Sequence, residues 1–138
     1  MITDVVAGLI TNEDKFMICQ RPKHQSHPLL WEFVGGKIEK GETPEQALIR
    51  ECKEELDILV SVGKIFMEVI HEYPQKTIRL KLYHAEIVQG EPKKIEPADI
   101  KWITCDQIDD FDFCPADIVI LDKIKKCYAN GLFPRQSY

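Results

Sequence analysis

Three carboxylates at helical spacing are the residues in this chain most suited to chemistry. Glu51, Glu54 and Glu55 stand at i, i+3 and i+4, which places them on one face if the segment is helical. Carboxylates so close together repel one another unless a cation lies between them. A Glu-rich helix face is more often simply solvated, with Arg50 pairing with Glu54, so the spacing by itself leaves both interpretations open.

The segment that carries these carboxylates has strong helix signals. Thr43, Pro44 and Gln46 form the pattern of a capping box with proline at the first helical position, and good helix formers continue to Leu56. An apolar stripe lies away from the carboxylates and is formed by Leu48, Ile49, Cys52 and Leu56. We therefore predict a helix over 44–56 with a core side and an acidic side.

Glycines precede this helix at positions where a chain can approach a ligand closely. Gly35-Gly36 predicts a tight turn, and Gly41 supplies another permissive position just before Glu42. The Gly-Gly turn, the glutamate six residues after Gly36 and the paired acidic residues on the helix form a more specific pattern than one charge run. This pattern favours a cation site over a solvated face.

The stretch from Gly36 to Ile58 resembles the signature of the Nudix hydrolases, Gly-x5-Glu-x7-Arg-Glu-U-x-Glu-Glu-x-Gly-U, where U is a bulky aliphatic residue. The matching residues are Gly36, Glu42, Arg50, Glu51, Glu54, Glu55 and Ile58. Two positions depart, because Cys52 replaces an aliphatic residue and Asp57 replaces the glycine that ends the helix. Cysteine is small and often buried, and aspartate tolerates the left-handed conformation better than most residues. Neither change removes a carboxylate of the cluster, so we expect an active enzyme.

The resemblance extends to the flanking residues and is strongest for the MutT-type branch of this family. Trp31-Glu-Phe-Val-Gly-Gly-Lys-Ile-Glu39 is similar to a segment of that branch, with Val34 where proline is usual. The resemblance implies an α/β fold in which a mixed sheet lies between helices (α/β/α). It also implies Mg²⁺ (or Mn²⁺) and attack by water on a triphosphate, which releases a nucleoside monophosphate and pyrophosphate. The implied metal set is Gly36, through its carbonyl, with Glu51, Glu54, Glu55 and Glu96.

The resemblance also assigns catalytic roles. Arg50 would orient a neighbouring carboxylate, and the alternative is a plain helix salt bridge. One of Glu51, Glu54 and Glu96 would accept a proton as general base, and the sequence does not rank them.

Substrate binding is expected from four residues. Arg21 and Lys37 are phosphate partners by resemblance, although Arg21 alone would also suit an exposed loop. Asp117 lies in a segment that resembles the base-recognition region of the branch, where an oxidised-guanine enzyme has Asn. Ionised Asp only accepts hydrogen bonds, which favours an amine such as that of cytosine, whereas protonated Asp also donates and admits 8-oxo-dGTP. The alternatives are that Asp117 caps the last helix and that Phe113 lies in the core instead of stacking on a base.

Composition agrees with one domain over 1–138. The chain is 44% hydrophobic, and its net charge of -5 argues against general nucleic-acid binding. Its five cysteines are scattered and odd in number, which suggests neither a zinc site nor a disulfide framework and favours a reducing cytoplasm. Neither a signal peptide nor a bilayer-spanning segment is apparent. We expect a small-molecule nucleotide substrate, no nucleic acid or membrane partner, and a monomer or weak homodimer.

The remaining segments predict interleaved strands and helices. We expect strands over 5–11, 15–20, 31–34, 64–71, 78–88 and 100–104. A helical turn is expected over 106–110 and a helix over 117–128, with Pro115 near its start and Gly131 past its end.

Three functions are compatible with these residues. The first is a metal-dependent nucleoside triphosphate pyrophosphohydrolase that sanitises the nucleotide pool, with 8-oxo-dGTP or CTP and dCTP as substrates. The second is a Nudix hydrolase for ADP-ribose or a dinucleotide, and the third is a nucleotide-binding sensor without turnover. The complete set of carboxylates disfavours the sensor.

Overall fold

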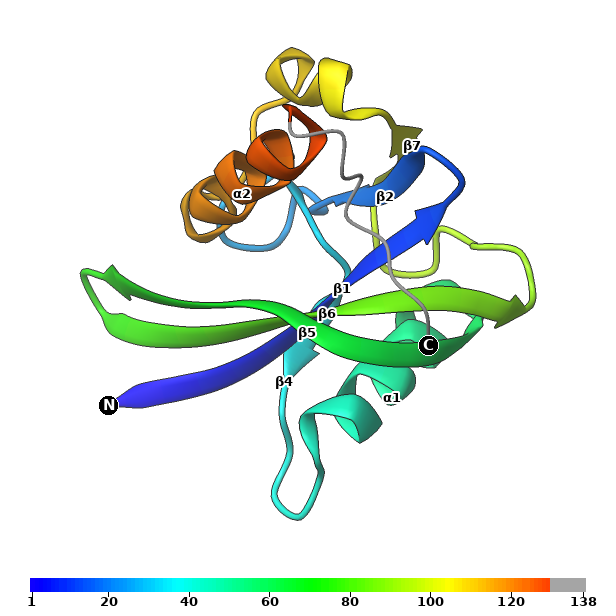
Figure 1. Ribbon diagram of the computed structural model, residues 1–138. Helices are drawn as coiled ribbons and strands as arrows, with labels where there is room; N and C mark the ends of the chain where they lie inside the picture. Colours follow the sequence, from blue (N-terminus) through cyan, green and yellow to red (C-terminus); the bar gives the residue numbers. More distant parts are fainter. Residues whose placement is uncertain (130–138) are drawn as a thin grey trace.

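The computed structural model describes residues 1–129 (Figure 1). The strands are β1 (Ile2–Asn12), β2 (Lys15–Gln20), β3 (Trp31–Glu32), β4 (Gly35–Lys37), β5 (Leu59–Tyr73), β6 (Lys76–Gln89) and β7 (Asp99–Ile103). The helices are α1 (Pro44–Leu56) and α2 (Ile118–Ala129), with two 3-10 helices, η1 (Cys105–Asp110) and η2 (Pro115–Asp117), before α2. Gly131, expected just past the last helix, lies outside the described residues.

The sheet is mixed and is organised around β1. Its strand order is β3-β2-β1-β6-β5, with β4 paired to β1 and β7 paired to β2 off this path. β1 runs parallel to β6, whereas the β1–β2, β1–β4 and β5–β6 pairs are antiparallel. The parallel pair at the centre requires a long crossover, and α1 lies within it.

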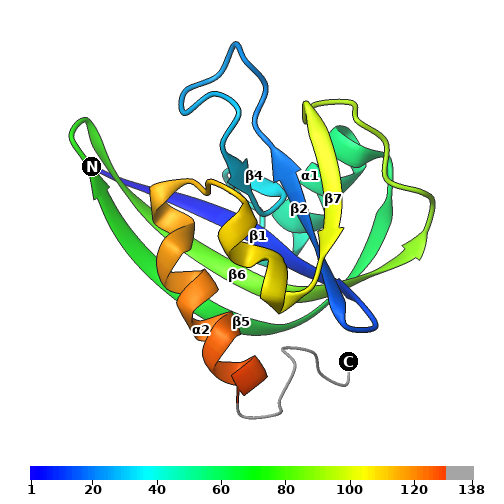
Figure 2. The same ribbon diagram turned by 90° about the horizontal axis from the view of Figure 1, so that it is seen from above.

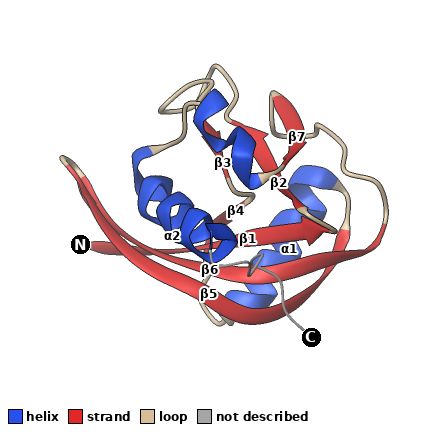
Figure 3. Ribbon diagram, turned by 45° about the horizontal axis from the view of Figure 1, so that its top comes forward, coloured by secondary structure: helices blue, strands red, loops and turns tan. Residues whose placement is uncertain are grey.

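Two hydrophobic clusters lie on opposite faces of this sheet. Along β1, Val6 and Ile10 join the cluster beneath α1, while Ala7 and Leu9 join the cluster beneath α2. This alternation follows from the two-residue period of a strand. The helices contribute Ala47, Leu48, Cys52 and Leu56 to one cluster and Ile120, Leu121 and Ile124 to the other. α1 and α2 therefore cover the sheet from opposite sides (Figures 1 and 3), and the predicted α/β/α sandwich is confirmed.

Helix α1 matches its prediction at both ends. The Thr43 side chain accepts a hydrogen bond from the Gln46 N–H at 3.1 Å, and the Gln46 side chain accepts one from the Thr43 N–H at 2.9 Å. Asp57 ends the helix in the left-handed conformation, with φ of 54°. Cys52 is fully buried, as its place in the apolar stripe predicted.

Other elements differ from their predicted limits. The expected strand over 31–34 is shortened to β3, and the expected Gly-Gly turn is wrong because Gly35 and Gly36 belong to β4. β5 is longer than predicted, because register shifts between Val62 and Met67 let it stay paired to β6 through Gly63-Lys64. The last helix is preceded by a 3-10 turn, so Asp117 lies in η2 and not in α2.

The β5–β6 hairpin extends beyond the body of the sheet (Figure 2). Near its tip, the Tyr73 ring lies 4.5 Å from the ring of His71, measured between centroids. It also lies 5.2 Å from the ring of His27, which belongs to the loop that connects β2 to β3. This aromatic contact joins the hairpin to the loop across the space between them.

Candidate active site

A cavity of about 910 Å³ runs from the acidic face of α1 to the tip of the β5–β6 hairpin. Ligand pockets in proteins typically measure roughly 300–1,000 Å³, so a nucleotide fits the size. The sheet contributes an apolar stretch to its wall through Val5, Ile78 and Leu80. Glutamates line one end, and Asp117 and Tyr73 line the other.

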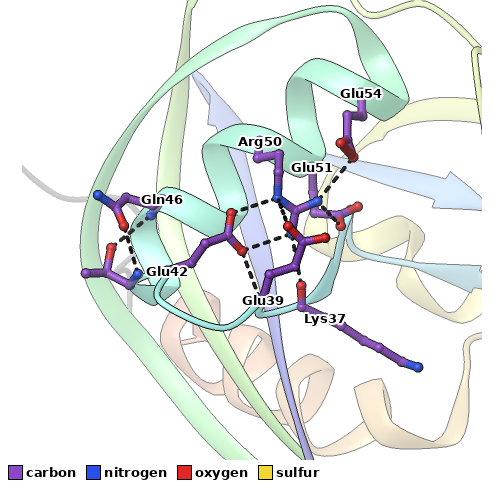
Figure 4. Close-up of polar contacts among 8 residues, drawn as sticks. Lys37, Glu39, Glu42, Gln46, Arg50, Glu51 and Glu54 are labelled. Atoms are coloured by element: carbon purple, nitrogen blue, oxygen red, sulfur yellow. Dashed lines mark hydrogen bonds and ion pairs between the residues drawn. The ribbon is translucent and has the colours of Figure 1, made fainter.

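Arg50 is the centre of the acidic end (Figure 4). Its guanidinium donates two hydrogen bonds to the Glu42 carboxylate, from Nε at 2.7 Å and from Nη2 at 3.0 Å. Its Nη1 donates to Glu51 at 2.8 Å and to Glu54 at 3.1 Å, and its Nη2 donates to the Lys37 carbonyl at 3.1 Å. Arg50 therefore contacts the Glu51 carboxylate, as the predicted orienting role requires, and also forms the helix pair with Glu54.

Glu42 anchors Arg50 and is not part of the described cavity wall. The hydrogen bond from Arg50 lowers the pKa of Glu42, and a second bond from the Glu39 N–H at 2.9 Å acts in the same direction. Gly41, with φ of 86°, permits the turn between these two glutamates. The fixed charge of Glu42 thus holds Arg50 in the orientation in which it meets Glu51.

The glycines before α1 are required by close packing. A Cβ on Gly36 would lie 2.5 Å from Cδ of Glu51, and a Cβ on Gly35 would lie 2.0 Å from the Val6 carbonyl oxygen. Both glycines have ordinary negative φ in this strand, so space and not backbone freedom requires them. The absence of a side chain lets β4 approach the Glu51 carboxylate directly.

Glu55 has the most buried and least satisfied carboxyl group among the glutamates of the acidic end. Its Oε2 atom is buried and has no hydrogen-bond partner in the described part of the chain. Burial, followed by the neighbouring Glu51 carboxylate, raises the pKa of Glu55 to about 10. A buried acceptor without a donor is costly, so this oxygen needs either a proton or a cation.

The residues present fit a divalent cation. All five predicted metal residues, Gly36, Glu51, Glu54, Glu55 and Glu96, line the one cavity. The carboxylates now face other partners, since Arg50 donates to Glu51 and Glu54, and Gln25 donates to Glu96. Within residues 1–129, no three His, Cys, Asp or Glu side chains converge in the arrangement of a metal centre. Hard cations such as Mg²⁺ and Mn²⁺ prefer oxygen ligands. Such a cation would neutralise the crowded carboxylates and give the buried Glu55 Oε2 a partner.

The predicted phosphate ligand Arg21 is bonded to Ser26 in its own loop and to Glu32 on β3. Its Nη1 donates to Glu32 at 2.9 Å, its Nε to the Ser26 carbonyl at 2.6 Å and its Nη2 to the Ser26 hydroxyl at 3.2 Å. Arg21 lines the cavity, but through these bonds its guanidinium holds the loop between β2 and β3 in place. Lys37 also lines the cavity, and Figure 4 shows its side chain extending away from the Arg50 cluster.

Asp117 is buried at the opposite end of the cavity, with only 5% of its surface exposed. Burial raises the pKa of Asp117 well above its ordinary value, the Glu32 carboxylate adds to this, and Arg21 opposes it. Its side chain makes no hydrogen bond to residues 1–129, whereas its backbone N–H donates to the Cys114 carbonyl at 2.9 Å. The helix-capping alternative is therefore not supported, and the carboxyl is available to a ligand.

Phe113 does not line the cavity described by residues 1–129. It is buried in the cluster beneath α2, and its backbone forms a bridge to Trp31. The alternative of a core residue is therefore the one that holds for Phe113.

Sequence reasoning missed several residues of the cavity wall, namely Gln25, His27, Glu32, Tyr73 and Lys76. Glu32 was open to prediction, because Trp31 is buried and strand alternation turns the next residue to the other face. Tyr73 and Lys76 flank the turn of the β5–β6 hairpin, and the sequence carries no signal for where that tip lies.

With this geometry in place, comparison with known proteins identifies the class. The chain belongs to the NUDIX domain family, whose model matches residues 5–123. It is 34% identical over 119 residues to a CTP pyrophosphohydrolase of Escherichia coli K12, covering 86% of this chain and 88% of that protein. It is also 34% identical over 123 residues to an 8-oxo-dGTP diphosphatase of the same organism, covering 88% of this chain and 95% of that protein.

The fold has solved relatives. The solution structure of the E. coli ORF135 protein superposes with a TM-score of 0.81 and 31% identity, covering 94% of this chain and 92% of that chain. The MutT protein from Methanosarcina mazei Go1 superposes with a TM-score of 0.80 at 22% identity, covering 93% and 95%, which supports the fold. Among residues 1–129, no helix combines the length and the apolar character needed to cross a membrane.

Proposed function

We propose that this protein hydrolyses nucleoside triphosphates to the monophosphate and pyrophosphate with Mg²⁺ or Mn²⁺, and so cleanses the nucleotide pool. The single observation that carries the proposal is the shape of the cavity, which joins a glutamate wall at one end to the buried Asp117 at the other. A nucleoside triphosphate has phosphates at one end, which need carboxylates that bind a metal, and a base at the other end, which needs a hydrogen-bonding group. The names of the relatives, CTP pyrophosphohydrolase and 8-oxo-dGTP diphosphatase, support the same activity.

At the acidic end the protein would hold the metal and the reacting water. Bound Mg²⁺ or Mn²⁺ supplies charge neutralisation for the phosphates and a lowered pKa for water. The Gly36 carbonyl and the carboxylates of Glu51, Glu54 and Glu55 would bind the metal, and Arg50 fixes Glu51 for this. Glu96 lines the same cavity from the loop before β7 and would complete the set. Lys37, which is exposed and lines the cavity beside Gly36, would be the cation suited to the phosphates at this end.

The proton from water would pass to Glu51, Glu54 or Glu96. Each of the three lines the cavity, and each is within the network that Arg50 or Gln25 organises. The pH–rate profiles of Glu51→Gln, Glu54→Gln and Glu96→Gln distinguish them, because only the base variant loses the acidic limb of the profile.

At the other end Asp117 would read the base. Burial raises the pKa of Asp117 well above its ordinary value and so favours the protonated carboxyl, which offers one donor and one acceptor. Cytosine presents an amine beside an acceptor nitrogen, and 8-oxoguanine presents N–H groups beside a carbonyl. A protonated Asp117 complements both edges, so both substrate classes named for the relatives are candidates for this chain.

A substrate panel tests the proposal. Purified protein with Mg²⁺ is expected to release pyrophosphate from CTP, dCTP or 8-oxo-dGTP faster than from dTTP. Monophosphate products from ADP-ribose or a dinucleotide, with no pyrophosphate from any triphosphate, would instead establish the second Nudix activity. Tight nucleotide binding without turnover, unchanged in Glu54→Gln, would establish a sensor.

A further inference from the structure

The loop over 90–98 is held against the C-terminal end of α1. The Lys93 N–H donates to the Leu56 carbonyl at 2.9 Å, and the Glu96 N–H donates to the Glu55 carbonyl at 3.2 Å. These carbonyls belong to the last turn of a helix, where no intrahelical donor is available to them. The loop therefore follows the helix end and delivers Glu96 to the cavity wall beside Glu55.

Asp57 connects the helix end to this loop through its side chain. One carboxylate oxygen accepts from Lys53 Nζ at 2.7 Å, and the other accepts from Lys93 Nζ at 2.8 Å. Its backbone has φ of 54°, which a glycine adopts with less strain. The Nudix signature has glycine here, and glycine offers no side chain for either lysine.

The start of the loop is also fitted to residue 57. Gly90 has φ of 95°, and a Cβ on it would lie 3.0 Å from the Asp57 carbonyl oxygen. The loop thus meets the backbone of Asp57 at Gly90 and its side chain at Lys93. Two contacts on one residue set the path of the chain toward Glu96.

We propose that Asp57 is a positioning residue for Glu96, acting through Lys93; the inference rests on the proposed function, because Glu96 matters only if the acidic end binds metal. Exposed ion pairs contribute little to stability, and both lysines are well exposed at 64% and 67%. The consequence of the Asp57 contacts is therefore the placement of the loop and not the stability of the fold.

Two variants separate placement from backbone strain. Asp57→Gly removes the bridge and relieves the left-handed strain, whereas Lys93→Ala removes the bridge and leaves residue 57 unchanged. Lys125→Ala is the matched control, because Lys125 forms a pair of 2.7 Å with the exposed Asp109 on η1, close to the 2.8 Å of the Lys93–Asp57 pair.

Three measurements follow in each variant. We expect Mn²⁺ binding to weaken about tenfold in Asp57→Gly and Lys93→Ala, the lower end for groups that hold a metal ligand in place. We expect the amides of residues 93 and 96 to exchange with solvent about tenfold faster, because their bonds to α1 open more often. The kcat with Mg²⁺ should fall while KM changes little, and Lys125→Ala should match the wild type in all three.

Unchanged Mn²⁺ binding and amide exchange in both bridge variants would overturn the proposal. A loss confined to Asp57→Gly would overturn it as well, since the Lys53 contact or the changed backbone at residue 57, and not Lys93, would then be the cause. Binding and exchange are measured without substrate, so they decide the role of Asp57 even if the chain hydrolyses no nucleotide.

Discussion

The two ends of the cavity are built in different ways. At the acidic end one guanidinium holds three carboxylates and a backbone carbonyl, and all of these groups come from residues 37–54. At the other end Asp117, Tyr73 and His27 come from three separate segments and meet through ring contacts and burial. A densely bonded end suits chemistry that requires fixed geometry, and a sparsely bonded end suits recognition that can vary with the base.

The largest expected effect is at the acidic end. Glu51→Gln is expected to lower kcat/KM for every triphosphate by about a thousandfold, within the range of groups that carry proton transfer or hold the reacting centre. Glu86→Gln, an exposed glutamate on β6, is the control and should leave the rate unchanged. A steady-state assay of pyrophosphate release checks this, and a loss below tenfold would mean that Glu51 is peripheral.

The crowding of carboxylates should appear as a dependence of stability on pH. In the folded protein the pKa of Glu55 is raised to about 10 from 4.5, so the folded state loses stability as pH rises through this window. In metal-free protein, Glu55→Gln is expected to raise the free energy of unfolding by about 2 kcal/mol near pH 8 and by little near pH 4. Denaturant unfolding at the two pH values measures the difference. Equal effects at both would contradict a raised pKa.

The base end should respond in preference more than in rate. Asp117→Asn keeps one donor and one acceptor but fixes which atom donates, so it is expected to change the ratio of kcat/KM for dCTP and 8-oxo-dGTP by about tenfold. The comparison of the two substrates on one variant cancels losses common to both. A ratio equal to that of the wild type would remove Asp117 from base recognition.

The smallest expected effect is at the aromatic contact between hairpin and loop. Tyr73→Ala removes the ring that lies against His27 and His71, and such contacts contribute about 0.5–1.5 kcal/mol. We expect KM to rise about fivefold with kcat nearly unchanged, because the wall and not the reacting end is altered. Initial-rate kinetics separate the two constants. A fall in kcat with constant KM would show that the two ends are not independent.

The contrast between the ends also explains what the sequence could predict. The acidic end lies in one contiguous segment, where helix periodicity and the capping box place Glu51, Glu54 and Arg50 without reference to the rest of the chain. Cys52 and Asp57 were open to the same local reasoning, and both occupy the predicted environments.

The rest depends on contacts between distant segments. Gly35 and Gly36 form a strand because β1 pairs with them, and no local signal distinguishes this from a turn. The engagement of Arg21 with Ser26 and Glu32, and the approach of Tyr73 to His27, follow from where the loop and the hairpin meet. Asp117 was identified by resemblance, but its burial, which raises its pKa, follows only from the packing of η2.

In the proposed function, one cavity divides chemistry and base reading between its two ends. The most direct test measures kcat/KM for CTP, dCTP, 8-oxo-dGTP and dTTP with Mg²⁺ in the wild type, Glu51→Gln and Asp117→Asn. We predict that Glu51→Gln lowers all four values by a common factor, whereas Asp117→Asn changes the ratios among them. A change of kcat/KM by the same factor for every substrate in Asp117→Asn would contradict this division. A wild type that releases no pyrophosphate would contradict it as well.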